Sequence, residues 1–122
     1  MKKVVLILLL ILSISCSKGE SSQEKLYSIT SAVTAIRDGA TLVDIRDEKE
    51  RQEKGFLKYS LHIPFEAIHD RMLEFGEDKM QSIVIYSGDD NDSKKAKKIL
   101  IESGYKNVIS GISYKDLAKH LS

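Results

Sequence analysis

The chain has 122 residues, 42% of them hydrophobic and 30% charged, with a formal net charge of +1 and one cysteine. A charge so close to zero provides no basic field for a nucleic acid, so we expect no nucleic-acid partner. One cysteine excludes an internal disulfide and a Cys-rich zinc site, and the length suits one small domain.

The first sixteen residues have the pattern of a bacterial lipoprotein signal. Lys2 and Lys3 precede an unbroken apolar run of nine residues, Val4–Leu12, which ends shortly before Cys16. This run is too short to span a bilayer as a helix, which needs about 20 residues, but it suits the core of a secretory signal. Small residues before Cys16 resemble the lipobox, although Ser13 stands where that motif usually has Leu.

We therefore predict a signal peptide at residues 1–15 and acylation of Cys16, which would attach the protein stably to a membrane. The alternative is an ordinary signal peptide with an incidental cysteine. The polar residues 16–25 are expected to form a tether for a domain at residues 26–122. The expected location is the extracytoplasmic side of the bacterial cell envelope, where the partners would be the membrane and an envelope protein. The sequence assigns no oligomeric state.

The predicted domain begins with one weak and one strong strand candidate. Residues 27–29 are the weak candidate, and Val33 and Ile36 mark a helix that ends at Gly39. The run LVDI at residues 42–45 is the strong candidate, because short β-branched runs suit strands covered on both faces.

Polar and helical patterns follow this strand. Residues 47–54 are wholly polar and predict a short exposed helix with two i,i+4 ion pairs, Asp47/Arg51 and Glu50/Lys54. Residues 60–62 are a further weak strand candidate. An apolar stripe then predicts a helix that ends near Gly76; its members are Phe65, Ile68, Met72 and Phe75.

The second half repeats the alternation. The run IVIY at residues 83–86 is a strong strand candidate, and residues 93–103 predict a helix stopped by Gly104. Residues 107–109 are a weak strand candidate. A last helical stripe consists of Tyr114, Leu117, Ala118 and Leu121, with Ser113 and Asp116 as a capping-box-like start.

Strands that alternate with helices predict an α/β fold. We expect a central, mostly parallel sheet of about five strands with helices on both faces. Ligands bind such sheets at the carboxyl ends of the strands, so the loop after residues 83–86 is the candidate ligand-binding loop. Its residues are Ser87, Gly88, Asp89, Asp90, Asn91, Asp92 and Ser93.

Four short motifs follow one another along the chain. A strand ends in Asp-x-Arg at residues 42–46, and GFLKYSLHIP occupies residues 55–64. Strand, loop and helix follow at residues 83–104, and SGISY closes the series at residues 110–114. Over residues 26–121 this arrangement resembles the rhodanese-like domain family, whose fold is the α/β architecture expected above.

The resemblance implies a lost active site. Active members of this family carry a cysteine directly after the strand, and it becomes a persulfide beside loop amides and a helix N-terminus that hold the anion. Here Ser87 occupies the cysteine position, and Asp92 lies where Arg is common. A neutral serine hydroxyl cannot take up sulfur as a persulfide, and the loop carboxylates would repel an anionic substrate.

We therefore interpret the domain as a non-catalytic module for binding or scaffolding, with no cofactor. The same departures exclude a cysteine-dependent phosphatase. The alternative is a sulfurtransferase-type enzyme that handles thiosulfate or persulfide sulfur with an atypical loop. A third reading is a structural envelope protein without a ligand.

Other readings of individual residues are less favoured. Ser87 lacks the flanking glycines of a nucleophile elbow. The oxygen-rich loop lacks the Gly and Glu of an EF-hand, so we expect no metal there and a helix capped by Asp92 or Ser93. Asp44 and Arg46 are expected to form a structural pair, because a buried carboxylate needs a partner. The lysines of residues 94–98 are expected to face solvent.

Overall fold

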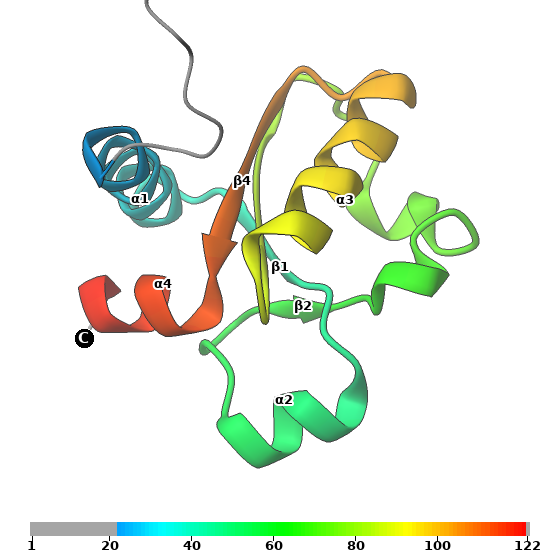
Figure 1. Cartoon of the computed structure of the whole chain (residues 1–122). Helices are drawn as coiled ribbons and strands as arrows, with labels where there is room; N and C mark the ends of the chain where they lie inside the picture. Colours follow the sequence, from blue (N-terminus) through cyan, green and yellow to red (C-terminus); the bar gives the residue numbers. More distant parts are fainter. Residues whose placement is uncertain (1–21, 122) are drawn as a thin grey trace, which may run out of the picture.

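Four parallel strands form the centre of the structure, a computed structural model that describes residues 22–121 (Figure 1). The sheet order is β2-β1-β3-β4, and the strands are β1 (Thr41–Asp44), β2 (Leu61–His62), β3 (Ser82–Ser87) and β4 (Asn107–Ser113). The predicted α/β class is thus confirmed, with four strands in place of about five.

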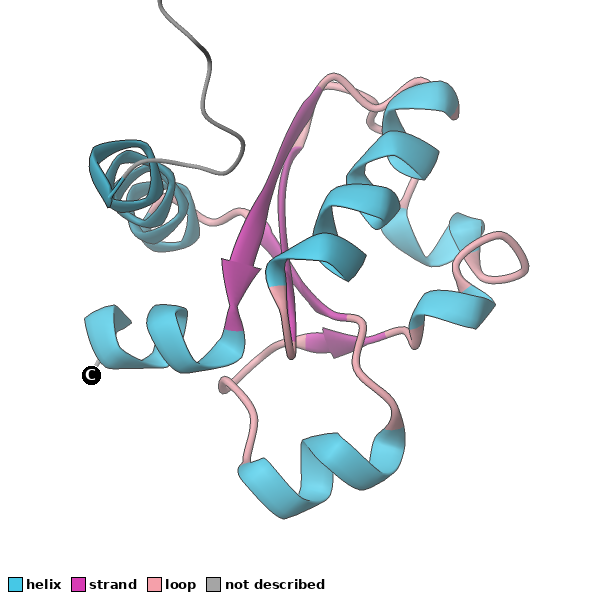
Figure 2. Cartoon of the chain, in the orientation of Figure 1, coloured by secondary structure: helices cyan, strands magenta, loops and turns pink. Residues whose placement is uncertain are grey.

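Helices cover both faces of this sheet (Figure 2). One face carries α1 (Ser22–Arg37) and α4 (Tyr114–Leu121), and the other carries α3 (Asp90–Glu102) with the 3-10 helices η1 (Phe65–Ala67) and η2 (Met72–Phe75). The exposed helix α2 (Glu48–Lys54) lies at the carboxyl edge of the strands. Among the described residues, no helix has the length and apolar character needed to cross a membrane.

The alternation of side chains along β3 explains why there are two core clusters. Ile83 and Ile85 are buried with Leu100 of α3, whereas Val84 and Tyr86 are buried on the face that α1 and α4 cover. Successive side chains of a strand point to opposite faces, so a strand covered on both sides is apolar at every position. The run at residues 83–86 has this composition.

The missing fifth strand is explained by α1. Residues 27–29 were expected to form a strand, but they lie within this helix. Ile29, Ala32 and Val33 are buried at the i, i+3, i+4 spacing of a helix face, so the helical period extends through the expected strand. The helix begins at Ser22, within the segment expected to be a tether, and Lys25 Nζ pairs with Asp116 Oδ2 at 2.9 Å.

The apolar stripe at residues 65–75 forms two 3-10 helices and not the single helix expected. A turn at residues 68–71 separates them, and the backbone angles of Arg71, φ −110° and ψ 22°, lie outside the helical region. Ile68 and Phe75 are nonetheless buried in the core, and Gly76 ends η2 with a positive φ of 89°. The stripe therefore identified core residues correctly but not the type of helix.

Asp44 at the end of β1 is fully buried and fixes the carboxyl edge of the sheet. Its Oδ1 accepts hydrogen bonds from Arg46 N and Nε, both at 3.0 Å. Its Oδ2 accepts from Arg46 Nη2 at 2.8 Å, from Tyr86 OH at 3.0 Å and from Arg51 Nε at 3.2 Å. One carboxylate therefore joins β1, β3 and α2.

The network around Asp44 also decides the partner of Arg51. Among the described side chains, neither ion pair predicted for α2 is formed. Arg51 turns to Asp44, while Asp47 caps α2 by accepting a hydrogen bond from Glu50 N at 2.7 Å. A buried carboxylate attracts an arginine more strongly than an exposed one does, because water screens it less.

Burial and hydrogen bonding act in opposite directions on the pKa of Asp44. Burial raises this pKa, but the hydrogen bonds and charge of Arg46 outweigh burial and hold it below the ordinary value of 3.8. Burial also raises the pKa of the Tyr86 hydroxyl, which therefore remains a proton donor.

We predict that Asp44→Asn lowers the free energy of unfolding at neutral pH by about 3 kcal/mol, because it leaves the buried guanidinium of Arg46 without its anion. Urea denaturation measures this change. Asp70→Asn, which replaces an exposed carboxylate, is the matched control and should change stability by less than about 0.5 kcal/mol.

The stability difference should also depend on pH. Because the pKa of Asp44 is lowered by folding, its contribution is present above the unfolded value of 3.8 and is lost as pH falls through the folded value. The parent and the Asn variant should therefore converge in acid. A difference that stays constant down to about pH 2 would contradict the lowered pKa.

Candidate functional site

The loop after β3 opens onto a small cavity at the carboxyl edge of the sheet. The cavity has a volume of about 120 Å³ and lies between β1, α2, η1 and the start of α3. Ser87 and Gly88 form part of its wall, with Ile45 and Phe65 nearby. This volume suits one side chain or small ion, and is below that of most sites for organic ligands, about 300 Å³ or more.

Ser87 was expected in the loop, but it is the last residue of β3 and pairs with Ser113 of β4. The side chain is 2% exposed, and its hydroxyl donates a hydrogen bond to the backbone oxygen of Asp89. A hydroxyl that donates its proton to a backbone carbonyl is not activated as a nucleophile, because activation needs a base that accepts this proton. Ser87 therefore lies at the carboxyl edge of the sheet, as expected, but does not have the environment of a reactive group.

Helix α3 begins three residues earlier than predicted and is capped by a different residue. Asp89 is the N-cap, and its Oδ1 accepts a hydrogen bond from Asp92 N at 3.1 Å. The expectation that Asp92 or Ser93 caps this helix was wrong, because Ser93 is buried and accepts a hydrogen bond from Gly111 N at 2.8 Å. A carboxylate of the protein thus occupies a helix amide that could otherwise bind an anion.

Carboxylates dominate the wall of the cavity. The acidic side chains that line it are Asp47, Glu50, Glu66, Asp89 and Asp92. Arg46 is the one cationic side chain among the lining residues, and it already forms two side-chain hydrogen bonds with Asp44. An anionic substrate would therefore meet net repulsion, whereas a cationic group would be attracted.

Glu50 of α2 contributes one of these carboxylates. Its carboxylate lies against Gly88, so closely that a Cβ on residue 88 would collide with Glu50 Oε2. Gly88 has no positive φ, so its glycine leaves room for the carboxylate, and a larger residue would require the flexible Glu50 side chain to move. A negative charge from α2 thus covers the segment directly after Ser87.

Sequence reasoning identified the acids of the loop but missed Asp47, Glu50 and Glu66. Asp47 and Glu50 belong to the start of α2, which follows β1, and Glu66 follows β2. The sequence could have indicated these acids, because they follow predicted strands and the carboxyl ends of adjacent parallel strands meet at one edge of the sheet.

The structure describes the side chains of this loop except that of Asp90. Among the described residues, no group of three His, Cys, Asp or Glu side chains is arranged to hold a metal ion.

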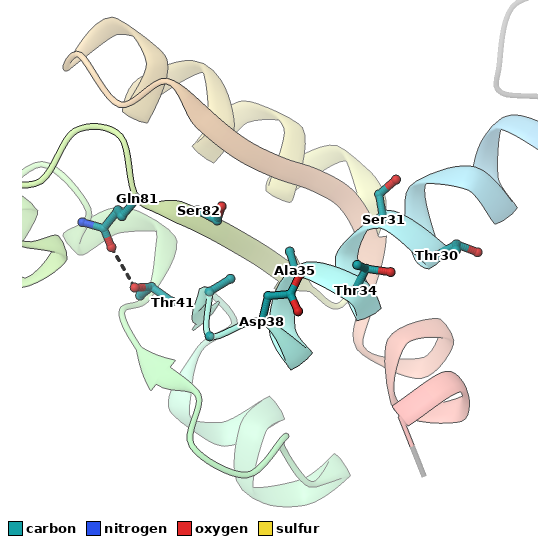
Figure 3. A pocket seen from close by; sticks show the side chains of 10 residues that line it. Thr30, Ser31, Thr34, Ala35, Asp38, Thr41, Gln81 and Ser82 are labelled. Carbon is teal, nitrogen blue, oxygen red and sulfur yellow. Dashed lines mark hydrogen bonds between the residues drawn. The ribbon is translucent and has the colours of Figure 1, made fainter.

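A different hollow lies at the opposite edge of the sheet (Figure 3). It has a volume of about 670 Å³ and is lined mainly by small polar side chains of α1 and of the starts of β1 and β3. Thr41 Oγ1 donates a hydrogen bond to Gln81 Oε1 at 2.7 Å across its rim. Parallel sheets bind ligands at the other edge, so we place the candidate site at the loop after β3.

Known structures share the fold described above. A rhodanese with anions from E. coli is 26% identical over 66% of this chain and 93% of that chain, with a TM-score of 0.58. The reduced CoADR-RHD protein of Bacillus anthracis is 26% identical over 76% of this chain, with a TM-score of 0.62, but this chain spans only 16% of that protein. A possible tyrosine phosphatase of Rhodopseudomonas palustris shows the same fold at 18% identity, with a TM-score of 0.58.

The sequence profile of the Rhodanese-like domain matches residues 28–111. No curated protein matches the sequence. The profile covers well over half of the 122 residues, and it includes the first three motifs and the first two residues of the fourth. The chain therefore belongs to the rhodanese-like domain family.

Proposed function

We propose that this chain is a non-catalytic rhodanese-like module that is anchored through Cys16 to the membrane of a bacterial cell envelope and binds a protein partner there. The observation that carries the proposal is the state of Ser87, which is buried and donates its proton to a backbone carbonyl where the family has a reactive cysteine. Sulfur transfer needs a nucleophile that can form a sulfur–sulfur bond with the donor. A serine oxygen cannot form this bond.

The charge of the cavity supports the same conclusion independently. Thiosulfate is an anion, and the five acidic side chains of the wall would repel it. Two of these acids also occupy positions that an anion would need, since Asp89 caps α3 and Glu50 covers Gly88. Replacing Ser87 alone would therefore restore only part of an anion-binding site.

The acidic wall favours a cationic group as its ligand. The cavity of about 120 Å³ can accept the end of a Lys or Arg side chain, and its carboxylates would supply hydrogen-bond acceptors. We propose that the partner presents such a side chain from an exposed segment of an envelope protein. The loop after β3 then serves recognition in place of catalysis.

We predict that the full chain does not turn over thiosulfate and cyanide. Ser87→Cys should give weak activity, because it supplies a thiol within an acidic wall. The double variant Ser87→Cys/Asp92→Arg should be more active by about tenfold or more, because a cation replaces one of the repelling carboxylates. The measurement is the rate of thiocyanate formation by each purified protein.

A matched variant controls for the only native thiol. Cys16→Ser should leave all rates unchanged, since Cys16 lies outside the domain that carries the loop. Turnover by the parent that survives Cys16→Ser would sink the non-catalytic proposal and favour the sulfurtransferase alternative. If neither Ser87 variant is active, the charges of α2 would be expected to block the reaction as well. Adding Glu50→Gln to the double variant then tests whether the Glu50 carboxylate is responsible.

We predict that Cys16 carries the lipid anchor. Metabolic labelling with a palmitate analogue should mark the parent and the neighbouring control Ser17→Ala but not Cys16→Ala, because the thiol is the acceptor of the lipid. The parent should also sediment with membranes, and Cys16→Ala should lose stable attachment. Equal labelling of the Cys16→Ala protein would overturn the anchor.

A further inference from the structure

Glu50 also lines another cavity, and the wall of this second cavity at the carboxyl edge is mainly positively charged, whereas the wall beside Ser87 is mainly negative. The second cavity has a volume of about 450 Å³ and lies between α2, α4 and the loop after β3, whose arrangement is visible in Figure 1. Its lining includes three cations, Arg46, Lys54 and Lys115, but only one acid, Glu50. This volume falls within the range of small-molecule sites, about 300–1,000 Å³.

The two lysines that line this cavity are exposed and form no ion pair with another described residue. Lys54 ends α2 and Lys115 lies in the first turn of α4, and both are exposed. Among the described residues, neither has an ion-pair partner, although the sequence predicted one between Lys54 and Glu50. With Arg46, these lysines give the lining three cations against the single carboxylate of Glu50, an excess of positive charge that attracts a negative ligand.

Arg46 supplies an unsatisfied donor at the same place. Its residue is 4% exposed, and its Nη1 is the one buried side-chain polar atom among the described residues that lacks a hydrogen-bond partner. The guanidinium lies 4.3 Å from the centroid of the Tyr114 ring, which also lines the cavity. A buried donor without an acceptor costs free energy, so an incoming oxygen would be favoured at this position.

The remaining wall decides which anion fits. Tyr114 and Ala118 of α4 also line the cavity and add an aromatic ring and a methyl group to its wall. An inorganic anion would leave this surface without a contact, whereas an organic acid would cover it. Glu50 opposes a second negative charge, which favours a monoanion.

We propose that the cavity between α2 and α4 binds a small carboxylic acid with an apolar body. The carboxylate lies between Lys54 and Lys115 and accepts a hydrogen bond from Arg46 Nη1 once the side chain of Glu50 moves aside, and the apolar body packs on Tyr114. This site does not depend on whether the domain transfers sulfur, because neither Ser87 nor Asp89 lines it.

Benzoate is the test ligand, and neutral benzamide of the same shape is its matched control. Both are titrated into the full chain in a nonionic detergent, followed by ¹⁵N NMR. Benzoate should shift the amides of Gly88 and Lys115 and the side-chain Nε–Hε signal of Arg46, with saturation at about 10 mM or below. Benzamide should produce no saturable shift.

Charge variants then distinguish this site from general anion attraction. The Lys54→Ala/Lys115→Ala protein should bind benzoate about tenfold more weakly, and Glu50→Gln about threefold more tightly, because each changes a charge beside the carboxylate. Lys106→Ala, at the opposite edge of the sheet, should bind like the parent. Equal binding of benzamide, unchanged affinity in the double lysine variant, or shifts confined to other surfaces would each overturn the proposal.

Discussion

The buried carboxylate of Asp44 is the interaction on which the geometry of the site depends. Its two oxygens accept hydrogen bonds from Arg46, which follows β1, from Arg51 of α2 and from Tyr86 of β3. A buried charge is tolerated only when it is paired and hydrogen-bonded, so the three elements must meet at one point. This meeting brings the acids of α2 beside the loop after β3 and leaves Arg46 between the two cavities.

The two cavities have opposite charge because α2 contributes to both. Asp47 lies toward the loop and caps the helix, whereas Lys54 lies at its other end and lines the second cavity. Glu50 separates the two and covers Gly88. These charged residues lie outside the two core clusters, so the charge of the site can differ while the rhodanese-like architecture stays the same.

Sequence patterns predicted the parts of this structure that depend on local periodicity. The sequence predicted β1 and β3 from apolar runs, α3 from an apolar stripe and α2 from its polar composition. Each pattern follows from burial: the two strands are buried on both faces, α3 on one face and α2 on none. The strand expected at residues 27–29 was wrong because three residues are too few to separate the two periods. The acids Asp47, Glu50 and Glu66 were missed at the site, because only the shared carboxyl edge of the parallel strands, and not spacing along the chain, brings them beside the loop.

We expect that the loop after β3 takes up no sulfur, and the mass of the protein after exposure to thiosulfate measures this. Peptide mapping would locate any added sulfur atom, and a Ser87→Cys protein serves as the positive control. No peptide from residues 22–121 of the parent should gain sulfur, while the variant should gain one sulfur atom at residue 87. A sulfur adduct on the parent peptide that contains Ser87 would contradict this expectation.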